Sequence, residues 1–370
     1  MKPYKKLNVL ILPTDACNMN CIYCFHLKNH KYFDKMQIET IKQFYDITFP
    51  NYEEVNIIWH GGEPLLMGLD FFNQAIELQN KYKAVSKITN SIQTNLTLMT
   101  DEFANFFHKN NISVSSSYDG ILNDKTRSFS QEIINRREKI IRTGMECGFI
   151  MIATSINIHT LIDSYKFFKQ RKIGYRINLY VGSSEDKLSL NPEIALKELA
   201  NFFNYYVQDE SCEISIELFV KFLSYFKTKK TSSCENTSCL GRWVGIRHDG
   251  SITPCNRYFP KEYLYGNISD YSDISQAFDS EGFKHLLTKA VERRKKCKEC
   301  EIFDFCSGGC NNIHLNETGI ENMGGNTCVI TKALFHYLED WYQNLNMDNF
   351  NGQIKNPLIL SKLKTKEVTL

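Results

Sequence analysis

The sequence predicts an α/β fold, a partial, TIM-like (β/α)6 barrel followed by a small cysteine-rich domain. Apolar runs of strand length alternate six times with segments of helical periodicity in residues 1–227. Such alternation is typical of a parallel sheet with right-handed crossovers, and six units are enough to curl into a partial barrel. Residues 228–343 contain short apolar pieces, turn residues and cysteines, which predicts a second, smaller domain. Residues 344–370 are polar and Lys-rich, and we expect a loosely packed tail.

The expected strands are short, apolar and rich in β-branched residues. They cover Leu7–Leu12, Val55–Trp59, Ile88–Thr94, Ile112–Ser117, Phe149–Ile156 and Tyr175–Val181. The expected helices lie between and after them, at Ile38–Phe49, Leu69–Tyr82, Asp101–Lys109, Gln131–Cys147, Leu161–Arg171 and from Glu193 to about Val207. Pro192 suits the first turn of the last of these helices.

Composition excludes several kinds of partner. The 370 residues include 44 basic and 42 acidic side chains, a net charge of +2, so no strong field favours nucleic acid. No stretch is long and apolar enough for a signal sequence or a membrane span, which predicts a cytoplasmic protein with no membrane partner. The first strand starts near Leu7, and we expect no room for a leader-binding domain before it.

Thirteen cysteines indicate metal ligation. The number is odd, and thiols stay reduced in a cytoplasmic protein, so a disulfide framework explains the count poorly. Three lie within Cys17–Cys24 and eight within Cys234–Cys328. Cys147 and Cys212 stand alone, and we expect them to be buried and inert.

The first motif, Cys17-x3-Cys21-x2-Cys24, directly follows the first expected strand. Three thiolates on a four-iron cluster leave one iron open to an external ligand. A zinc site closed by His26 as fourth ligand is the alternative that this motif alone leaves open.

Polar segments end the next three strands. They are His60-Gly61-Gly62-Glu63-Pro64, Gln93-Thr94-Asn95 and Ser117-Tyr118-Asp119-Gly120. Parallel strands place chemistry at their carboxyl ends, so we expect these segments to converge on the cysteine motif.

With these motifs the chain resembles the radical S-adenosylmethionine (SAM) superfamily. Its C-x3-C-x2-C loop is matched by Cys17, Cys21 and Cys24, and its GGE motif by Gly61, Gly62 and Glu63. The resemblance implies that SAM chelates the open iron, that the glycines let the backbone approach its methionine part, and that Glu63 accepts from its ammonium group.

The same resemblance implies further SAM contacts. Gln93, Asn95 and Ser117 would contact its ribose or carboxylate, Tyr23 its adenine and Arg127 its carboxylate. Asn95 or Ser117 as a strand-end cap, Tyr23 as a core aromatic and Arg127 as a surface residue remain open as alternatives.

The later cysteines follow the pattern Cys239-x10-Gly250-x4-Cys255, then Cys297-x2-Cys300-x5-Cys306-x3-Cys310, then Cys328. This resembles the SPASM extension of radical SAM proteins, and Cys234 supplies an eighth thiolate. Eight ligands suit two auxiliary four-iron clusters, so the implied cofactors are SAM and three [4Fe-4S] clusters. The resemblance implies auxiliary cluster I on Cys234, Cys239, Cys255 and Cys310, and auxiliary cluster II on Cys297, Cys300, Cys306 and Cys328. A zinc ribbon is the alternative. We expect the amides of Gly308 and Gly309 to approach cluster sulfurs.

The resemblance also implies a reaction class. One electron from a donor such as flavodoxin or ferredoxin would cleave SAM to a 5'-deoxyadenosyl radical, which takes a hydrogen atom from the substrate. An auxiliary cluster is then a plausible acceptor for the electron that the substrate radical loses, which favours oxidative products.

One residue favours a particular substrate. Asn256 follows Cys255, where sulfatase maturases have an aspartate, and an amide is no general base at neutral pH. We therefore predict a maturase that oxidatively cross-links side chains of a ribosomally made precursor peptide, by C–C, C–O or thioether bonds. Recognition would use the barrel mouth, the second domain or a separate leader-recognition protein. Arg257 is a candidate for binding a substrate carboxylate, with a structural ion pair as the alternative.

Two alternatives are kept. One is an anaerobic sulfatase-maturating enzyme that forms formylglycine from Cys or Ser. The other is a non-catalytic iron–sulfur module for peptide binding or electron transfer.

Overall fold

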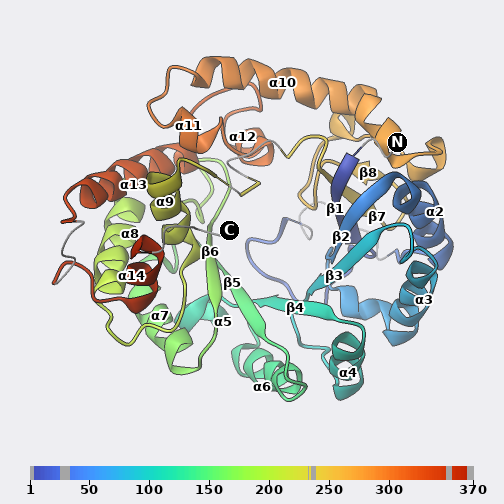
Figure 1. The fold of residues 1–370 in the computed structure, drawn as a ribbon, viewed down its shortest axis with the longest axis horizontal. Helices are drawn as coiled ribbons and strands as arrows, with labels where there is room; N and C mark the ends of the chain where they lie inside the picture. Colours follow the sequence, from blue (N-terminus) through green and yellow to red (C-terminus); the bar gives the residue numbers. More distant parts are fainter. Residues whose placement is uncertain (1–3, 26–33, 232, 235–238, 347–351, 365–370) are drawn as a thin grey trace. The chain divides into compact units, whose positions relative to one another are not determined.

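The computed structural model describes residues 4–25, 34–231, 233–234, 239–346 and 352–364 (Figure 1). The chain forms two compact units. The first unit comprises residues 1–117, 127–147 and 239–289, and the second comprises 118–126, 148–238 and 290–370. Each unit joins stretches that are distant in sequence, so the domain boundaries expected after residues 227 and 343 remain a prediction.

The first unit contains most of the parallel sheet. Its strands are β1 (Tyr4–Leu12), β2 (Tyr52–Trp59), β3 (Lys87–Gln93), β4 (Ile112–Ser117), β7 (Trp243–Arg247) and β8 (Ile252–Thr253). Its α-helices include α2 (Ile38–Thr48), α3 (Leu69–Asn80), α4 (Asp101–Lys109) and α6 (Ser130–Ile141). Its 3-10 helices include η1 (Phe49–Asn51), η2 (Pro64–Met67), η5 (Lys261–Tyr263), η6 (Ile268–Asp270) and η7 (Ile274–Asp279).

The strands of the first unit follow the order β4-β3-β2-β1-β7-β8. All neighbours are parallel except β7 and β8, which are antiparallel. Val9 of β1 lies between Ile57 of β2 and Val244 of β7. Since parallel strands end at the same edge, the segments that follow β1, β2, β3 and β7 come together there.

Aromatic side chains fill the space between this sheet and its helices. Helices α2, α3 and α4 lie along one side of the strands (Figure 1). Trp59, at the end of β2, is fully buried and meets Phe72 of α3 edge to face, with 5.4 Å between ring centroids. Phe72 in turn meets Phe107 of α4 at 6.0 Å. This core fixes the helices and sets the position of the strand ends that carry the site.

The second unit contains the remaining parallel pair and most of the later helices. Strands β5 (Cys147–Ala153) and β6 (Tyr175–Leu179) pair so that Met151 lies opposite Ile177. The α-helices include α5 (Asn123–Thr126), α7 (Leu161–Gln170), α8 (Pro192–Val207), α9 (Glu217–Thr228), α11 (Phe303–Cys306), α12 (Asn311–Glu317), α13 (Asn326–Gln343) and α14 (Pro357–Lys364), with 3-10 helices η3 (Gly120–Leu122) and η4 (Ile158–Thr160). Helix α10 (Glu281–Cys297) begins in the first unit and ends in the second.

The predicted α/β class is confirmed. Each of the six expected strands is present, with ends shifted by at most three residues. Cys147 and Cys212 are buried, as expected, at 1% and 3% exposure. Helix α9, strand β7 and the long helices α10 and α13 were not expected. None of the described helices combines the length and the apolar character needed to cross a membrane.

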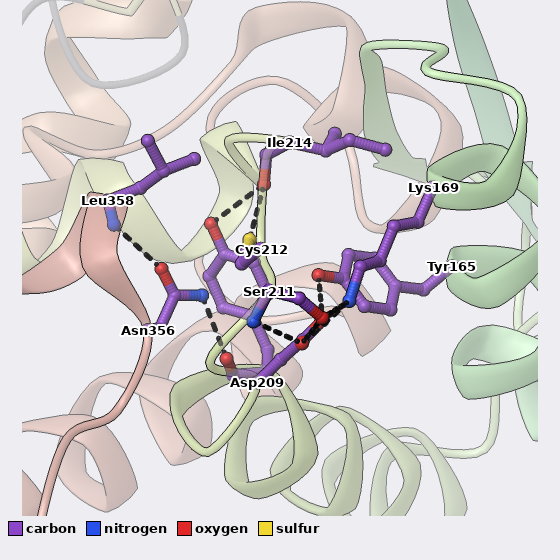
Figure 2. Close-up of polar contacts among 9 residues, drawn as sticks. Tyr165, Lys169, Asp209, Ser211, Cys212, Ile214, Asn356 and Leu358 are labelled. Atoms are coloured by element: carbon purple, nitrogen blue, oxygen red, sulfur yellow. Dashed lines mark hydrogen bonds and ion pairs between the residues drawn. The ribbon is translucent and has the colours of Figure 1, made fainter.

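The described part of the C-terminal stretch is packed, in contrast to the loose tail expected from its polar composition. Asn356 is fully buried, and its side-chain nitrogen donates to the carbonyl of Tyr206 at 2.8 Å (Figure 2). Its side-chain oxygen accepts from the N–H groups of Leu358 and Ile359, at 3.0 and 3.2 Å, and so caps the start of α14. One buried amide therefore attaches this segment to the end of α8.

Asp209 is the centre of a second polar cluster in this unit (Figure 2). Its carboxylate accepts from Lys169 and from the Tyr165 hydroxyl, each at 2.6 Å, and from the Ser211 N–H at 3.1 Å. Burial raises the pKa of Asp209, but these hydrogen bonds outweigh burial and hold it below its usual value. The cluster joins α7 to the turn after α8.

Replacing Asp209 with Asn should lower the free energy of unfolding by about 2 kcal/mol, because Lys169 then loses its anionic partner. A carboxylate whose pKa falls on folding contributes its full stabilisation of the folded protein above its unfolded pKa, about 4. The effect of the substitution is therefore complete at neutral pH, and it fades as the pH falls through the pKa of the folded state. Denaturant unfolding at neutral pH, at matched iron content, measures it. Asp163→Asn is the control, because Asp163 lies on α7, as Lys169 does, and is 62% exposed, so it should change stability by less than about 0.5 kcal/mol. Equal effects of the two variants would contradict the prediction.

Candidate functional site at the carboxyl ends of the first strands

The cysteine loop begins directly after β1. The Thr14 hydroxyl accepts from the Ala16 N–H at 3.1 Å and shapes the entry to the loop. Cys17 Sγ accepts from the Met19 N–H at 3.4 Å, as a thiolate ligand of an iron–sulfur cluster does. Burial raises the pKa of Cys17 to about 11, opposed by the Met19 hydrogen bond. The charges of Glu63, Cys21 and Cys24 raise the pKa of Cys17 further, which shows that the three thiols lie near one another. Iron that binds them would have to displace their protons.

The GGE segment packs its backbone against this loop. The Gly62 N–H donates to the carbonyl of Thr14 at 2.9 Å, and the Glu63 N–H to that of Ala16 at 2.7 Å. A Cβ atom added to Gly62 would lie 2.1 Å from the Ala16 oxygen, and one on Gly61, where φ is +104°, would lie 2.6 Å from the Thr14 oxygen. The glycines thus allow two loops to touch, a role that was not expected from the sequence. Their expected approach to SAM stays a prediction.

Glu63 is fully buried and is held by donors from two segments. It accepts from the Leu65 N–H at 2.9 Å, the Thr94 hydroxyl at 2.7 Å and the Asn95 N–H at 2.7 Å. Burial raises its pKa, although these donors and the charge of Arg127 oppose the shift. A carboxylate has about four lone-pair positions, so an acceptor position remains for an ammonium group. The acceptor position on Glu63 therefore fits SAM bound beside the cysteine loop.

Asn95 contacts the cysteine loop and also caps a strand end, whereas its expected contact with SAM stays a prediction. Its side-chain nitrogen donates to Asn18 in the cysteine loop at 2.9 Å and reaches Cys17 Sγ at 3.7 Å. Its oxygen accepts from the Thr97 N–H at 2.9 Å and caps the end of β3. Asn18 was not identified from the sequence.

Gln93 and Ser117 lie together at the ends of β3 and β4. The Gln93 side-chain nitrogen donates to the Ser117 hydroxyl at 2.9 Å, and its oxygen accepts from Ser115 at 2.6 Å. These bonds fix the amide orientation of Gln93. Contact of either residue with SAM stays a prediction.

Tyr23 and Arg127 form a pair at the cysteine loop. Arg127 Nη1 donates to the Tyr23 hydroxyl at 2.8 Å, and its guanidinium carbon lies 5.9 Å from the ring centroid. Both residues are half-buried, and their contact with SAM stays a prediction. The charge of Arg127 also lowers the pKa of the Glu63 carboxyl group, in opposition to burial.

A buried charge cluster not expected from the sequence adjoins this site. Asp15, two residues before Cys17, accepts from Arg247 Nη2 at 2.5 Å and lies 3.3 Å from His248 Nε2. The hydrogen bond with Asp15 raises the pKa of His248. Arg247 ends β7 opposite Leu12 of β1, so the cluster exists because β7 pairs with β1.

His60 and Asn256 form the other unexpected contact, with 3.2 Å between His60 Nε2 and the Asn256 side-chain nitrogen. The Gly61 N–H donates to His60 Nδ1 at 2.8 Å, so a neutral His60 carries its proton on Nε2. That proton needs an acceptor, so the Asn256 amide must turn its oxygen toward His60. Its NH2 group is then left as a donor. Arg257, next in sequence, is half-buried, and its substrate role stays a prediction.

In the second unit, four cysteines act on one another electrostatically. Burial raises the pKa values of Cys297 and Cys328, and it raises that of Cys306 to about 11. In each case the charge of neighbouring thiols within the set, which includes Cys300, raises the pKa further. A hydrogen bond from the Gly308 backbone lowers the pKa of Cys306, in line with the expected approach of this amide. This proximity supports the set predicted for auxiliary cluster II.

The set predicted for auxiliary cluster I is divided between the units. Cys239 and Cys255 belong to the first unit, where the charge of each raises the pKa of Tyr265. Cys234 and Cys310 belong to the second unit. Among the described residues, no three His, Cys, Asp or Glu side chains are placed to hold a single metal ion. His26, the alternative zinc ligand, lies outside the described residues. The assignment of cysteines to clusters therefore stays a prediction.

Known proteins share this arrangement. Residues 11–168 match the family described as "Radical SAM superfamily", and residues 234–301 match the "Iron-sulfur cluster-binding domain" SPASM. The cysteine-type anaerobic sulfatase-maturating enzyme of Clostridium perfringens is 30% identical over 82% of this chain and 88% of its own. The serine-type enzyme of Bacteroides thetaiotaomicron is 26% identical over 90% of this chain and 89% of its own. The solved structure of native anSMEcpe with bound AdoMet and Cp18Cys peptide has a TM-score of 0.82 and 26% identity, covering 92% of this chain and 98% of that one. The chain belongs to the radical SAM superfamily with a SPASM domain, in one family with the anaerobic sulfatase-maturating enzymes.

Proposed function

We propose that this radical SAM enzyme is an anaerobic sulfatase-maturating enzyme, which oxidises a Cys or Ser side chain of a sulfatase-type polypeptide to formylglycine. The observation that carries the proposal is the relationship to the Clostridium perfringens enzyme, which is 30% identical over 82% of this chain. Asn256 alone favours a cross-linking peptide maturase. The relatives support the alternative, a sulfatase-maturating enzyme, better.

The cofactors of the proposed reaction are SAM and three [4Fe-4S] clusters. Cys17, Cys21 and Cys24 would hold the first cluster, and the SPASM cysteines the two auxiliary ones. When bound, SAM and the first cluster supply a radical that takes a hydrogen atom from the substrate carbon. Glu63 would hold the SAM ammonium in place, and a donor such as flavodoxin or ferredoxin would supply the electron.

Asn256, held by His60, would orient the substrate by a hydrogen bond donated from its NH2 group. Neither group is arranged to take a proton, because His60 Nδ1 is occupied by the Gly61 N–H and an amide is not basic. The NH2 group of Asn256 suits a substrate carbonyl or hydroxyl oxygen. The same amide is the observation that favours the second candidate, the cross-linking maturase.

Asn256→Ala should leave turnover within about tenfold of wild type, because one neutral hydrogen bond contributes about 1 kcal/mol. Asn256→Asp is the matched variant, since a carboxylate accepts the hydrogen bond from His60 Nε2 equally well. Product formation per 5'-deoxyadenosine, measured anaerobically, checks the prediction. Total loss in Asn256→Ala would show that this amide has an essential role.

The experiment for the function uses reconstituted protein with SAM and reductant under anaerobic conditions. Its substrates are peptides that copy the modification site of a sulfatase, with Cys or Ser at the reactive position. An aldehyde trapped by a hydrazine reagent is the expected product. Loss of two hydrogens from a precursor peptide without an aldehyde would favour the cross-linking maturase instead. Absence of 5'-deoxyadenosine would favour a non-catalytic module.

A further inference from the structure

Arg293 is a buried cation, and its hydrogen-bond partners among the described residues are all neutral. It lies on α10 and is fully buried. Its Nε donates to the Gly308 carbonyl at 2.8 Å, and Nη2 donates to the Asn311 side-chain oxygen at 2.7 Å and the Gly309 carbonyl at 3.3 Å. Its Nη1 donates to the Ile320 carbonyl. None of the ion pairs between described residues of the second unit includes Arg293.

Such a cation needs a counter-charge. A buried charge without an opposite charge costs several kcal/mol, and arginine does not lose its proton in proteins. Burial lowers the pKa of Arg293, and the thiols of Cys297, Cys310 and Cys306 act in the opposite direction. The negative charges that act on Arg293 are therefore those of cysteine thiolates.

The contacts tie Arg293 to two segments that carry these cysteines. Cys297 lies four residues later on the same helix, so both side chains share one helix face. Gly308 and Gly309, whose carbonyls accept from Arg293, lie between Cys306 and Cys310. A Cβ atom added to Gly309 would lie 3.8 Å from Cys306 Sγ, which shows how close this loop comes to the thiol.

We propose that Arg293 is the buried counter-charge of the cluster held by Cys297, Cys300, Cys306 and Cys328, and that it raises the reduction potential of this cluster. Four thiolates give a four-iron cluster a net negative charge, which grows when the cluster takes an electron. A fixed positive charge inside the protein therefore stabilises the reduced form more than the oxidised form. The inference rests on the proposed cysteine assignment and not on the substrate.

Three variants test the proposal. Arg293→Gln removes the charge and keeps part of the hydrogen bonding, whereas Arg293→Lys keeps the charge. Lys296→Gln is the control, because it removes an exposed charge from the same helix, where Lys296 contacts the Glu321 carbonyl. Iron and sulfide are measured per chain, and each cluster is titrated by EPR-monitored potentiometry without substrate.

In Arg293→Gln the midpoint potential of one auxiliary cluster should shift to a more negative value. It should stay near the wild-type value in Arg293→Lys and in Lys296→Gln. Loss of that cluster from Arg293→Gln, with retention in Arg293→Lys, would equally show that the charge is needed. An unchanged potential in Arg293→Gln at full iron content, or loss of the cluster from both Arg293 variants, would overturn the proposal. Because no turnover is measured, failure of the proposed function leaves these outcomes readable.

Discussion

Replacing Gly62 with Ala should abolish assembly of the first cluster and, with it, reductive cleavage of SAM. The new Cβ atom would lie 2.1 Å from the Ala16 oxygen and 2.6 Å from the Asp15 oxygen, both of them backbone atoms. Carbon atoms do not approach oxygen this closely, so the backbone must move. The loop that leads into Cys17 would separate from the segment before Glu63, and the hydrogen bonds that join them would lengthen.

Iron content per chain and the yield of 5'-deoxyadenosine measure the effect of Gly62→Ala. We expect the iron of one cluster to be lost and the auxiliary clusters to remain. Gly174→Ala is the control, because a Cβ atom there meets nothing within 4 Å and its φ is not positive. Normal iron content and SAM cleavage in Gly62→Ala would show that the two loops tolerate separation.

The sequence predicted the parts of this site that depend on local pattern. The cysteine spacing, the GGE segment and the polar strand ends are contiguous motifs, and the parallel arrangement of strands brings them to one edge. The role of Gly62 was predicted incompletely. Sequence shows that a glycine is present but not which backbone it meets, and here Gly62 meets the cysteine loop.

The parts that were missed depend on pairings between distant segments. Strand β7 has five residues and contains a glycine, so its pattern gives little strand signal, yet its pairing with β1 places Arg247 beside Asp15. His60 and Asn256 are 196 residues apart, and their contact requires the same fold. Arg293 reads as one more basic residue in the charged run Glu292–Lys296, and only its complete burial distinguishes it.

Glu63→Gln should weaken SAM binding by about 10- to 100-fold, which corresponds to a hydrogen bond to a charged group of about 1.5–3 kcal/mol. The amide loses the negative charge that suits an ammonium ligand. It also presents an NH2 group to one of three donors, the Leu65 N–H, the Thr94 hydroxyl or the Asn95 N–H, where the carboxylate accepted. Because burial raises the pKa of Glu63, SAM affinity of the wild type should also fall on acidification at a higher pH than for an exposed glutamate.

Glu317→Gln distinguishes a binding role of Glu63 from a general effect of neutralising a buried carboxylate. Burial raises the pKa of Glu317 too, and its carboxylate accepts from the Thr327 N–H and hydroxyl, but it belongs to the second unit. Equilibrium SAM binding to reconstituted protein should be weakened in Glu63→Gln alone, while both variants lose stability. If Glu63→Gln binds SAM as tightly as Glu317→Gln and the wild type, Glu63 serves only to join β2 to β3. The ammonium group of SAM must then be held by another residue.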